Sequence, residues 1–363
     1  MTDIENSAPK YHVVEGYIKD LIDKGELLPG DQLPSENELV RQFNVSRHTV
    51  RQALGELGMK GWIYKEKGKG TFCAYRKSVQ KNKSVMVLTT YISDYIFPFI
   101  IKGIEDVLSS QGYSLILANT DNDKEKEAHC MENFLSHDIA GMIIEPTASA
   151  LGNPNIEYFK ELERRNVKYI MINAVYDDLD PAYIIMDDEL GGFRATNYLL
   201  QIGHRKIAGI FKSDDMQGIR RKQGFMRALA QFDITLPKGY VGSYNTMQMS
   251  SYPYQFTKNL LEREDRPTAI VCYNDQIAIN ILEAIREEGL KVPDDISVIG
   301  YDDSNLAVAS EVKLTTIKHP KKEMGTKSAQ YLIDMIEGNV EKPRMIYQPE
   351  LIVRSSCRGI SRE

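Results

Sequence analysis

Residues 34–39 (PSENEL) and 45–54 (VSRHTVRQAL) decide the fold of the first part of this 363-residue chain. Ser35, followed three residues later by Glu38, predicts a capping box at the start of a helix. That helix breaks at residues 43–45, and Ser46 predicts the cap of another helix that runs from Arg47 to about Lys60. Two short helices separated by a tight turn are typical of a helix-turn-helix.

Flanking elements complete a small module around this motif. Before it, apolar residues at helical spacing predict a helix over residues 11–24, which Gly25 ends. After it, Gly61 ends the basic helix, and residues 62–64 and 71–73 predict a β-hairpin with a charged tip at 65–70. The sequence therefore predicts an α+β winged helix-turn-helix domain.

The helix that begins at Arg47 has the side chains needed to read DNA. Its apolar residues share one narrow arc, so the polar ones face solvent: Arg47, His48, Arg51 and Gln52. Arg47 and Arg51 are one turn apart, and a guanidinium matches the two acceptors of guanine or a phosphate. Free amides at the helix start, with the hydroxyls of Ser46 and Thr49, suit a phosphate. The short basic hairpin tip suits a minor groove.

Charge is distributed unevenly along the chain. The formal net charge is −6, yet residues 41–83 contain eleven basic and two acidic residues, and the rest of the chain from residue 84 is acidic. A basic block on an acidic body is expected where one part meets phosphate. A merely solvated basic surface would give the same count, so charge alone leaves both interpretations open.

The segments PSENEL, VSRHTVRQAL, Gly61-Trp62-Ile63 and Gly68-Lys69-Gly70-Thr71-Phe72 closely resemble the GntR-type winged helix over residues 10–73. The resemblance implies DNA contacts from Arg41, Arg47, Thr49, Arg51 and Gly70, usually in a homodimer on a palindromic operator. The full set of candidate DNA-binding residues is Ser35, Glu36, Arg41, Ser46, Arg47, His48, Thr49, Arg51, Gln52, Lys67, Lys69 and Gly70.

The pattern of apolar residues changes in the remainder of the chain. We expect a DNA-binding domain at 1–74, an exposed linker at 75–84 with almost nothing to bury, and an effector-binding and dimerisation domain at 85–363. Beyond the linker, short apolar runs alternate with helical stretches such as 99–110, 188–201, 217–232 and 276–288. Eight such runs predict parallel sheets covered by helices, in two Rossmann-like α/β lobes with a cleft between them: 85–90, 114–119, 141–145, 168–173, 184–187, 206–211, 268–273 and 297–301.

Composition excludes several classes of protein. The four cysteines stand far apart, which gives neither a disulfide framework nor a zinc signature. The polar residues 1–9 and the short apolar runs predict neither a signal peptide nor a membrane span, so we expect a cytoplasmic protein that lies on the nucleoid when bound to its operator. We find no GxGxxG, Walker A, GxSxG or HExxH motif, and we predict no catalytic residue, metal or cofactor.

The body resembles the LacI/GalR effector domain. The likeness covers about residues 83–358 and is carried by residues 201–208 (QIGHRKIA), 269–278 (AIVCYNDQIA), 298–303 (VIGYDD) and 314–317 (LTTI). It implies a two-lobed periplasmic-binding-protein fold with the ligand between the lobes, and dimerisation through the lobe nearest the linker, with 99–110 as a candidate surface. Over nearly its full length the chain is similar to the arabinose-responsive repressors of Gram-positive bacteria, which implies L-arabinose as an effector that lowers operator affinity.

Candidate effector-binding residues come from the ends of the predicted strands. Ligands of parallel sheets lie beyond the carboxyl ends of the strands, and a sugar requires carboxylates, amides and an aromatic platform. The candidates are Asp94, Tyr95, Phe97, Glu145, Asn173, Asp187, Arg194, Lys212, Arg221, Asn274, Asp302 and His319. Each has a purely structural alternative: Asn274 can cap a helix, Asp302 can shape a turn, Tyr95 and Phe97 can be core, and Lys212 and His319 can be solvated.

One position departs from the resemblance. Where many relatives place an arginine after Asp187 to clamp the sugar, this chain has Phe193, with Arg194 adjacent. Either Arg194 takes that role or the pocket clamps its ligand differently.

Three alternatives remain open at this point. A regulator of the same architecture could respond to another pentose or hexose. A sugar-processing enzyme could carry a DNA-binding head, although no catalytic motif supports it. An exported solute-binding protein shares the body fold, but the missing signal peptide and the basic head oppose it.

Overall fold

The computed structural model describes residues 10–74, 83–93 and 95–360. The chain divides into two compact units, Met1–Lys81 and Asn82–Glu363, which we call the head and the body. Most of the predicted linker, residues 75–82, lies outside the described residues, and its last residue, Ser84, begins the first strand of the body.

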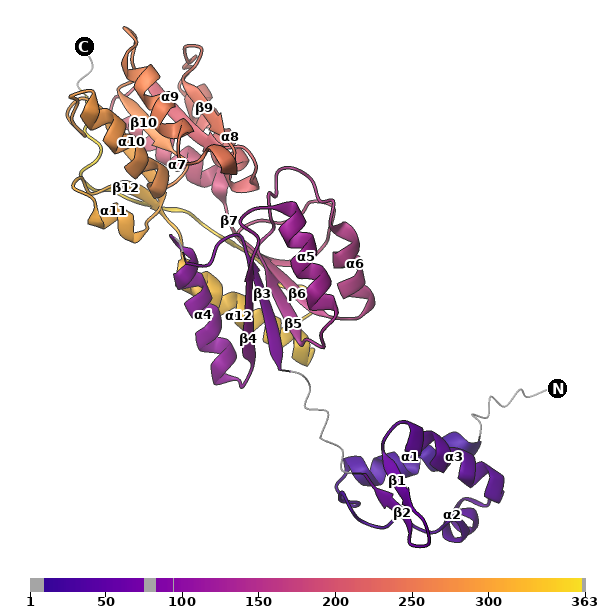
Figure 1. The fold of residues 1–363 in the computed structure, drawn as a ribbon. Helices are drawn as coiled ribbons and strands as arrows, with labels where there is room; N and C mark the ends of the chain where they lie inside the picture. The colour runs from indigo at the N-terminus through magenta and orange to yellow at the C-terminus, as the bar shows by residue number, and fades with distance from the viewer. Residues whose placement is uncertain (1–9, 75–82, 94, 361–363) are drawn as a thin grey trace, which may run out of the picture. The chain divides into compact units, whose positions relative to one another are not determined.

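The head has the predicted elements in the predicted order. Its helices are α1 (Lys10–Asp23), α2 (Glu36–Phe43) and α3 (Arg47–Met59), and β1 (Ile63–Glu66) pairs with β2 (Gly70–Cys73) in an antiparallel hairpin (Figure 1). The capping box at α2 is confirmed: the Glu38 amide donates to Ser35 Oγ at 3.3 Å, and the Ser35 amide donates to the Glu38 carboxylate at 2.7 Å. Apolar faces of all three helices meet in one core that includes Val14, Ile18, Leu39, Val50 and Leu57.

The body consists of two α/β lobes, each built on a six-stranded sheet. In the first lobe the strand order is β13-β7-β6-β5-β3-β4, and all of its pairs are parallel. The strands are β3 (Ser84–Thr89), β4 (Ser114–Asn119), β5 (Gly141–Ile144), β6 (Lys168–Ile172), β7 (Ala182–Met186) and β13 (Arg344–Tyr347). Its helices are α4 (Phe97–Ser110), α5 (Lys124–Leu135), α6 (Ile156–Arg164) and α12 (Lys321–Glu337).

The second lobe has the strand order β14-β12-β11-β10-β8-β9. Its strands are β8 (Ile207–Lys212), β9 (Val241–Tyr244), β10 (Ala269–Cys272), β11 (Ser297–Asp302), β12 (Thr315–Lys318) and β14 (Glu350–Ile352). Its helices are α7 (Asp188–Gln201), α8 (Met216–Gln231), α9 (Tyr252–Leu261), α10 (Asp275–Glu287) and the short α11 (Asn305–Ala309), with a 3₁₀ turn at Thr246–Gln248.

The prediction of purely parallel sheets is wrong in one detail, because β14 runs antiparallel to β12. The chain crosses between the lobes three times: from β7 into α7, from β12 into α12, and from β13 into β14. All of the strands at these crossings lie at one edge of their sheets. The crossings therefore mark the hinge side of the body.

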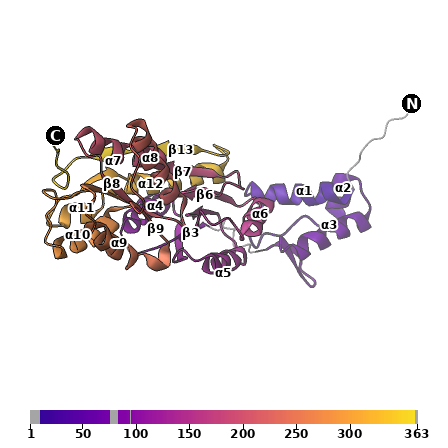
Figure 2. The same cartoon turned by 90° about the horizontal axis from the view of Figure 1, so that it is seen from above.

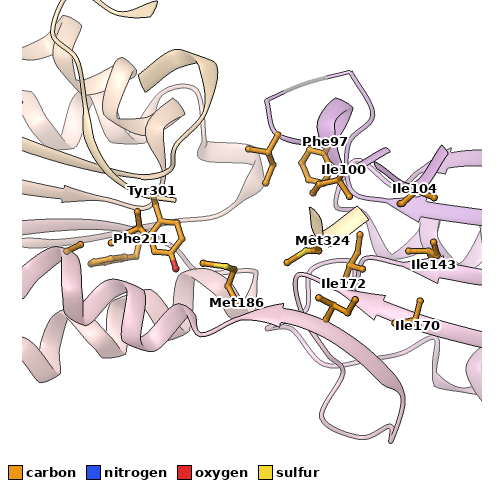
Figure 3. Close-up of a cluster of buried hydrophobic side chains, with 14 of the residues drawn as sticks. Phe97, Ile100, Ile104, Ile143, Ile170, Ile172, Met186, Phe211, Tyr301 and Met324 are labelled. Atoms are coloured by element: carbon orange, nitrogen blue, oxygen red, sulfur yellow. The ribbon is translucent and has the colours of Figure 1, made fainter. Parts of the chain in front are cut away.

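Close helix pairs hold the layers of each lobe together. Helices α4 and α12 pack side by side in the first lobe, as α7 and α8 do in the second (Figure 2). A Cβ on Gly325 would lie 2.1 Å from the Ile100 carbonyl oxygen, so α12 can approach α4 this closely only with glycine there. One cluster of buried apolar side chains continues across both lobes, from Ile104 and Phe97 to Phe211 and Tyr301 (Figure 3). Within the described residues, no helix is long and apolar enough to span a membrane.

Candidate functional site

The N-terminal part of α3 presents a polar surface on the head. Arg47, His48, Arg51 and Gln52 are exposed, and the arc behind them is buried. Ser46 caps the helix by accepting from the Thr49 amide at 3.1 Å, and the two hydroxyls lie 2.8 Å apart. The candidates outside α3 are placed as follows: Ser35, Arg41, Lys67 and Lys69 are exposed, and Glu36 and Gly70 are partly buried.

Glu36 connects three elements of this surface. Its carboxylate accepts from Arg51 Nε on α3 at 2.9 Å and from Lys65 Nζ on β1 at 3.3 Å. The hydrogen bond from Arg51 contributes most to holding the pKa of Glu36 below its usual range, and the bond from Lys65 adds to this effect. The hairpin is anchored separately, because Gln32 Nε2 donates to the Lys69 carbonyl at 2.8 Å. The basic hairpin is therefore held beside α3.

A cavity lies between the two lobes of the body, and its empty space is about 750 Å³ when the open solvent at its mouth is included. Nine of the predicted effector residues line it: Tyr95, Phe97, Glu145, Asn173, Lys212, Arg221, Asn274, Asp302 and His319. Asp94 lies outside the described residues.

Two predicted effector residues do not line the cavity. Asp187 caps α7, with its carboxylate accepting from the Leu190 amide at 2.9 Å, and the next residue, Asp188, lines the cavity instead. The prediction for Arg194 is wrong, because its guanidinium donates to the Pro349 carbonyl in a separate hollow. Phe193 packs beneath the guanidinium of Arg227, 4.8 Å away.

Arg221 is the fixed cation of the cavity. Reaching in from α8, it is 5% exposed, its Nε lies 2.8 Å from Asp188, and one terminal nitrogen donates to the Tyr273 carbonyl at 2.8 Å. The guanidinium also stacks 3.5 Å from the Tyr301 ring. Burial raises the pKa of Asp188 to about 6, and the charge of Arg221 opposes that rise. A planar guanidinium so restrained is pre-organised to donate to ligand oxygens.

Lys212 forms a second charged group at the end of β8. It is only 5% exposed, so the solvated alternative is wrong for this residue. Its ammonium lies 3.0 Å from Asp215 and 3.1 Å from Asp214. Burial works against the charged form, but these carboxylates outweigh it and raise the pKa of Lys212.

A polar chain runs along the first-lobe wall. Glu145 accepts from the Thr90 hydroxyl at 2.6 Å and from Asn173 at 2.8 Å, and Asn173 Oδ1 lies 3.1 Å from His319 Nε2. Burial raises the pKa of Glu145 and lowers that of His319 to about 3, which makes the imidazole neutral at pH 7. His319 is 4% exposed, so it too is not a solvated surface residue.

On three of the residues that line the cavity, a buried side-chain atom has no hydrogen-bond partner among the described residues. These atoms are the Tyr91 hydroxyl oxygen, His319 Nδ1 and Gln217 Oε1. Buried polar atoms are normally paired, so each is a candidate partner for a ligand hydroxyl.

Structural and cavity-lining roles coincide at three other residues. Asn274 caps α10 by accepting from the Ile277 amide at 3.0 Å, yet it also lines the cavity. Asp302 has a left-handed φ of 94°, which turns the chain after β11 and leaves its buried carboxylate in the cavity. Tyr95 belongs to the first lobe and reaches the second. There its hydroxyl donates to the Tyr301 carbonyl at 2.9 Å and accepts from the Asp275 amide at 3.1 Å.

Sequence reasoning missed several lining residues, and most had a usable signal. Tyr273 directly follows the apolar strand β10, and Asn122, Asp215 and Gln217 follow β4 and β8 by three to five residues. The lining of the cavity therefore extends further into the loops beyond the strand ends than the sequence analysis predicted. Within the described residues, no group of histidine, cysteine or acidic side chains could hold a metal ion.

Known proteins match both parts of the chain. A model for bacterial regulatory proteins of the gntR family matches residues 10–73, and one for a periplasmic binding protein-like domain matches residues 196–357. The chain is 48% identical to an arabinose metabolism transcriptional repressor of Geobacillus stearothermophilus, over 98% of this chain and 100% of the relative. It is 45% identical to one of Halalkalibacterium halodurans, over 96% of each. The solved structure of a LacI family transcriptional regulator from Enterococcus faecium with bound ribose is 26% identical, with a TM-score of 0.65, over 77% of this chain and 100% of that chain.

Proposed function

Because the chain belongs to the family of arabinose metabolism transcriptional repressors, a family of DNA-binding regulators rather than enzymes, we propose that its head binds operator DNA and its body binds L-arabinose between the lobes. The sugar lowers the affinity of the head for the operator. The protein works in the cytoplasm, on the nucleoid when bound, and as a homodimer on a palindromic site.

The proposal for the head rests on α3 and the hairpin. Arg47 pairs with no acidic side chain of the described head, so its guanidinium is available to a base edge or a phosphate. Arg41, Arg51, His48 and Gln52 extend the same polar surface, and Lys67 and Lys69 place charge at the hairpin tip. Helix N-termini that enter the major groove contact bases through their first residues.

The observation that carries the effector proposal is the unpaired polar lining of a buried cavity. Because Nε2 of the neutral imidazole donates to Asn173 Oδ1, His319 Nδ1 is an acceptor, as is Gln217 Oε1, and sugar hydroxyls can donate to both. Tyr95 and Phe97 offer ring faces to the C–H surface of the sugar, and Glu145, Asp188 and Arg221 supply charge-assisted hydrogen bonds. In this cavity Arg221 replaces the arginine that the resemblance placed at Phe193.

Coupling between the two sites requires only a modest energy difference. A sugar that binds one arrangement of the dimer better shifts the population toward that arrangement. A coupling free energy of about 1–3 kcal/mol changes operator affinity by roughly 5- to 150-fold.

Calorimetric titration of the purified protein with L-arabinose, D-xylose, D-ribose and D-galactose tests the effector. We expect binding of L-arabinose and its loss in Arg221→Gln, with Arg286→Gln on the exposed face of α10 as the matched control. Both variants remove one guanidinium, and the thermal transition of each variant shows whether the fold survives, because Arg221 also pairs with the buried Asp188. Stronger binding of ribose, the sugar seen in the Enterococcus faecium regulator, would assign another pentose, and failure of all four sugars would reject the effector proposal.

A further inference from the structure

The topology of the body defines a mouth opposite the hinge. The crossing strands β7, β13, β12 and β14 lie at one edge of the two sheets, and β4 and β9 lie at the other. The loops that follow β4, β8 and β9 are therefore farthest from the crossings. When two lobes separate about a hinge, contacts at this distance open the most.

Direct hydrogen bonds join the lobes at this mouth. Asn122, after β4, donates from its Nδ2 to Thr246 Oγ1 at 2.7 Å, and Thr246 follows β9. Thr246 donates in turn to the Asp214 carboxylate, from its amide at 2.8 Å and from its hydroxyl at 2.7 Å. Beside them, the Met216 amide at the start of α8 donates to Ser149 Oγ in the first lobe at 2.9 Å.

The first-lobe side of these contacts is held in an unusual conformation. Asn122 has a φ of 59° and Ala148 a φ of 39°, and the Ala148 amide donates to Asn122 Oδ1 at 2.6 Å. Non-glycine residues in the left-handed region persist only where their surroundings hold them. The amide group of Asn122 thus ties together two loops of its own lobe and one loop of the other.

Three of these residues lie just outside the cavity, where Thr246 contacts Asn122 and Asp214 contacts Lys212. Thr246, Asp214 and Ser149 do not line it, whereas Asn122 does. Ser149 is 8% and Asp214 6% exposed, so water competes poorly for their hydrogen bonds. Removal of a buried hydrogen bond weakens the state that contains it more than a surface bond would.

We propose that Asn122, Ser149, Asp214 and Thr246 form a latch that holds the mouth of the cavity closed and sets how fast the bound sugar leaves. This inference rests on the proposed function for its ligand. Thr246 and Ser149 are positioning residues in it, because their hydroxyls bond to groups of the other lobe and neither residue lines the cavity.

The test compares Thr246→Val, Ser149→Ala and the double variant of the full chain with three controls. Thr246→Ser keeps the hydroxyl, Ser136→Ala removes an exposed hydroxyl on the first lobe, and the wild type sets the reference. Dissociation and association rates of ¹³C-labelled L-arabinose are measured by exchange NMR. Hydrogen–deuterium exchange of the peptide that contains Met216 is measured in protein without sugar.

We expect each single variant to raise the dissociation rate about fivefold and the double variant more than about tenfold. The association rate should change less than about twofold, because affinity changes within one site act mainly through dissociation. Thr246→Ser and Ser136→Ala should match the wild type, and Met216 should exchange faster in the double variant.

The outcomes separate the latch from the effector proposal. A wild type that binds no tested sugar rejects L-arabinose, and the latch is then decided by exchange at Met216 alone. Unchanged hydrogen–deuterium exchange at Met216 in the double variant overturns the latch. Faster exchange with an unchanged sugar dissociation rate overturns its control of ligand release.

Discussion

At the scale of single residues, the end-of-strand rule placed nine of its twelve candidates in the lining of the cavity but missed other lining residues. It succeeded where a side chain directly follows a strand, as with Glu145, Asn173 and Lys212. It failed at Asp187, because a helix cap uses the first carboxylate of the Asp187-Asp188 pair and turns the second inward. Spacing cannot tell which of two adjacent acids is the cap.

Arg47 is the residue whose loss should separate the two functions. We expect Arg47→Ala to weaken operator binding roughly 5- to 150-fold, since a good bidentate contact contributes about 1–3 kcal/mol, and to leave sugar binding unchanged. Lys24→Ala, which removes an exposed cation directly after α1, is the control. Labelled operator DNA and calorimetry measure the two affinities, and equal loss of both would contradict separate sites.

Glu15 makes the stability of the head depend on pH. It is 4% exposed, and hydrogen bonds from Lys19 at 2.7 Å and Lys60 at 2.9 Å lower its pKa to about 2. Because the pKa of Glu15 is lower in the folded head than its usual value of 4.5, the ionised carboxylate stabilises the fold fully when the pH is above about 4.5. This contribution disappears as the pH falls toward 2. Glu15→Gln should therefore destabilise the head at pH 7 and progressively less below pH 4.5.

Trp62, the only tryptophan, lies in the head, so its fluorescence during urea unfolding reports this unit. Glu26→Gln, at an exposed position, should follow the wild type at every pH. A constant difference between Glu15→Gln and wild type from pH 7 to pH 2 would show that the ion pairs do not stabilise the head.

At the scale of elements, local signals predicted the helices better than the sheet edges. Capping residues and Gly61 defined α2 and α3 closely, because caps act within one turn. Four short strands are absent from the eight predicted runs, and two of them, β9 and β12, have only four residues each. The other two, β13 and β14, have four and three residues and lie at the edges of the sheets. Their pairing depends on the crossings between lobes, which no local pattern records.

The α4–α12 contact supplies a prediction at this scale. Gly325→Ala forces a Cβ against the Ile100 carbonyl, and such overpacking destabilises a fold by about 1–3 kcal/mol. The thermal transition of the body, followed by circular dichroism, should fall, while the Trp62 transition of the head stays in place. Gly55→Ala on α3, where nothing lies within 4 Å of the added Cβ, should instead stabilise the head by about 0.5–1 kcal/mol. An unchanged body transition would mean that the helices can move apart.

At the scale of the whole molecule, the two-part architecture followed from the sequence, whereas the identity of the sugar came from similarity to relatives. Apolar runs between helices predict two α/β lobes, because buried parallel strands need helices on both faces. In the proposed effector site, the choice between sugars depends on the placement of groups such as Gln217, Arg221 and His319, and this placement is set by packing between lobes. Sequence spacing contains no such information.

We propose that sugar binding in the body controls operator binding by the head, and one titration tests this communication. Duplex DNA selected by this protein from a random pool is labelled, and its anisotropy is followed as L-arabinose, D-xylose, D-ribose or D-galactose is added to the complex. We expect L-arabinose alone to release the DNA, with operator affinity reduced roughly 5- to 150-fold. DNA that stays bound at sugar concentrations that saturate the cavity would contradict the claim that the cavity controls the head.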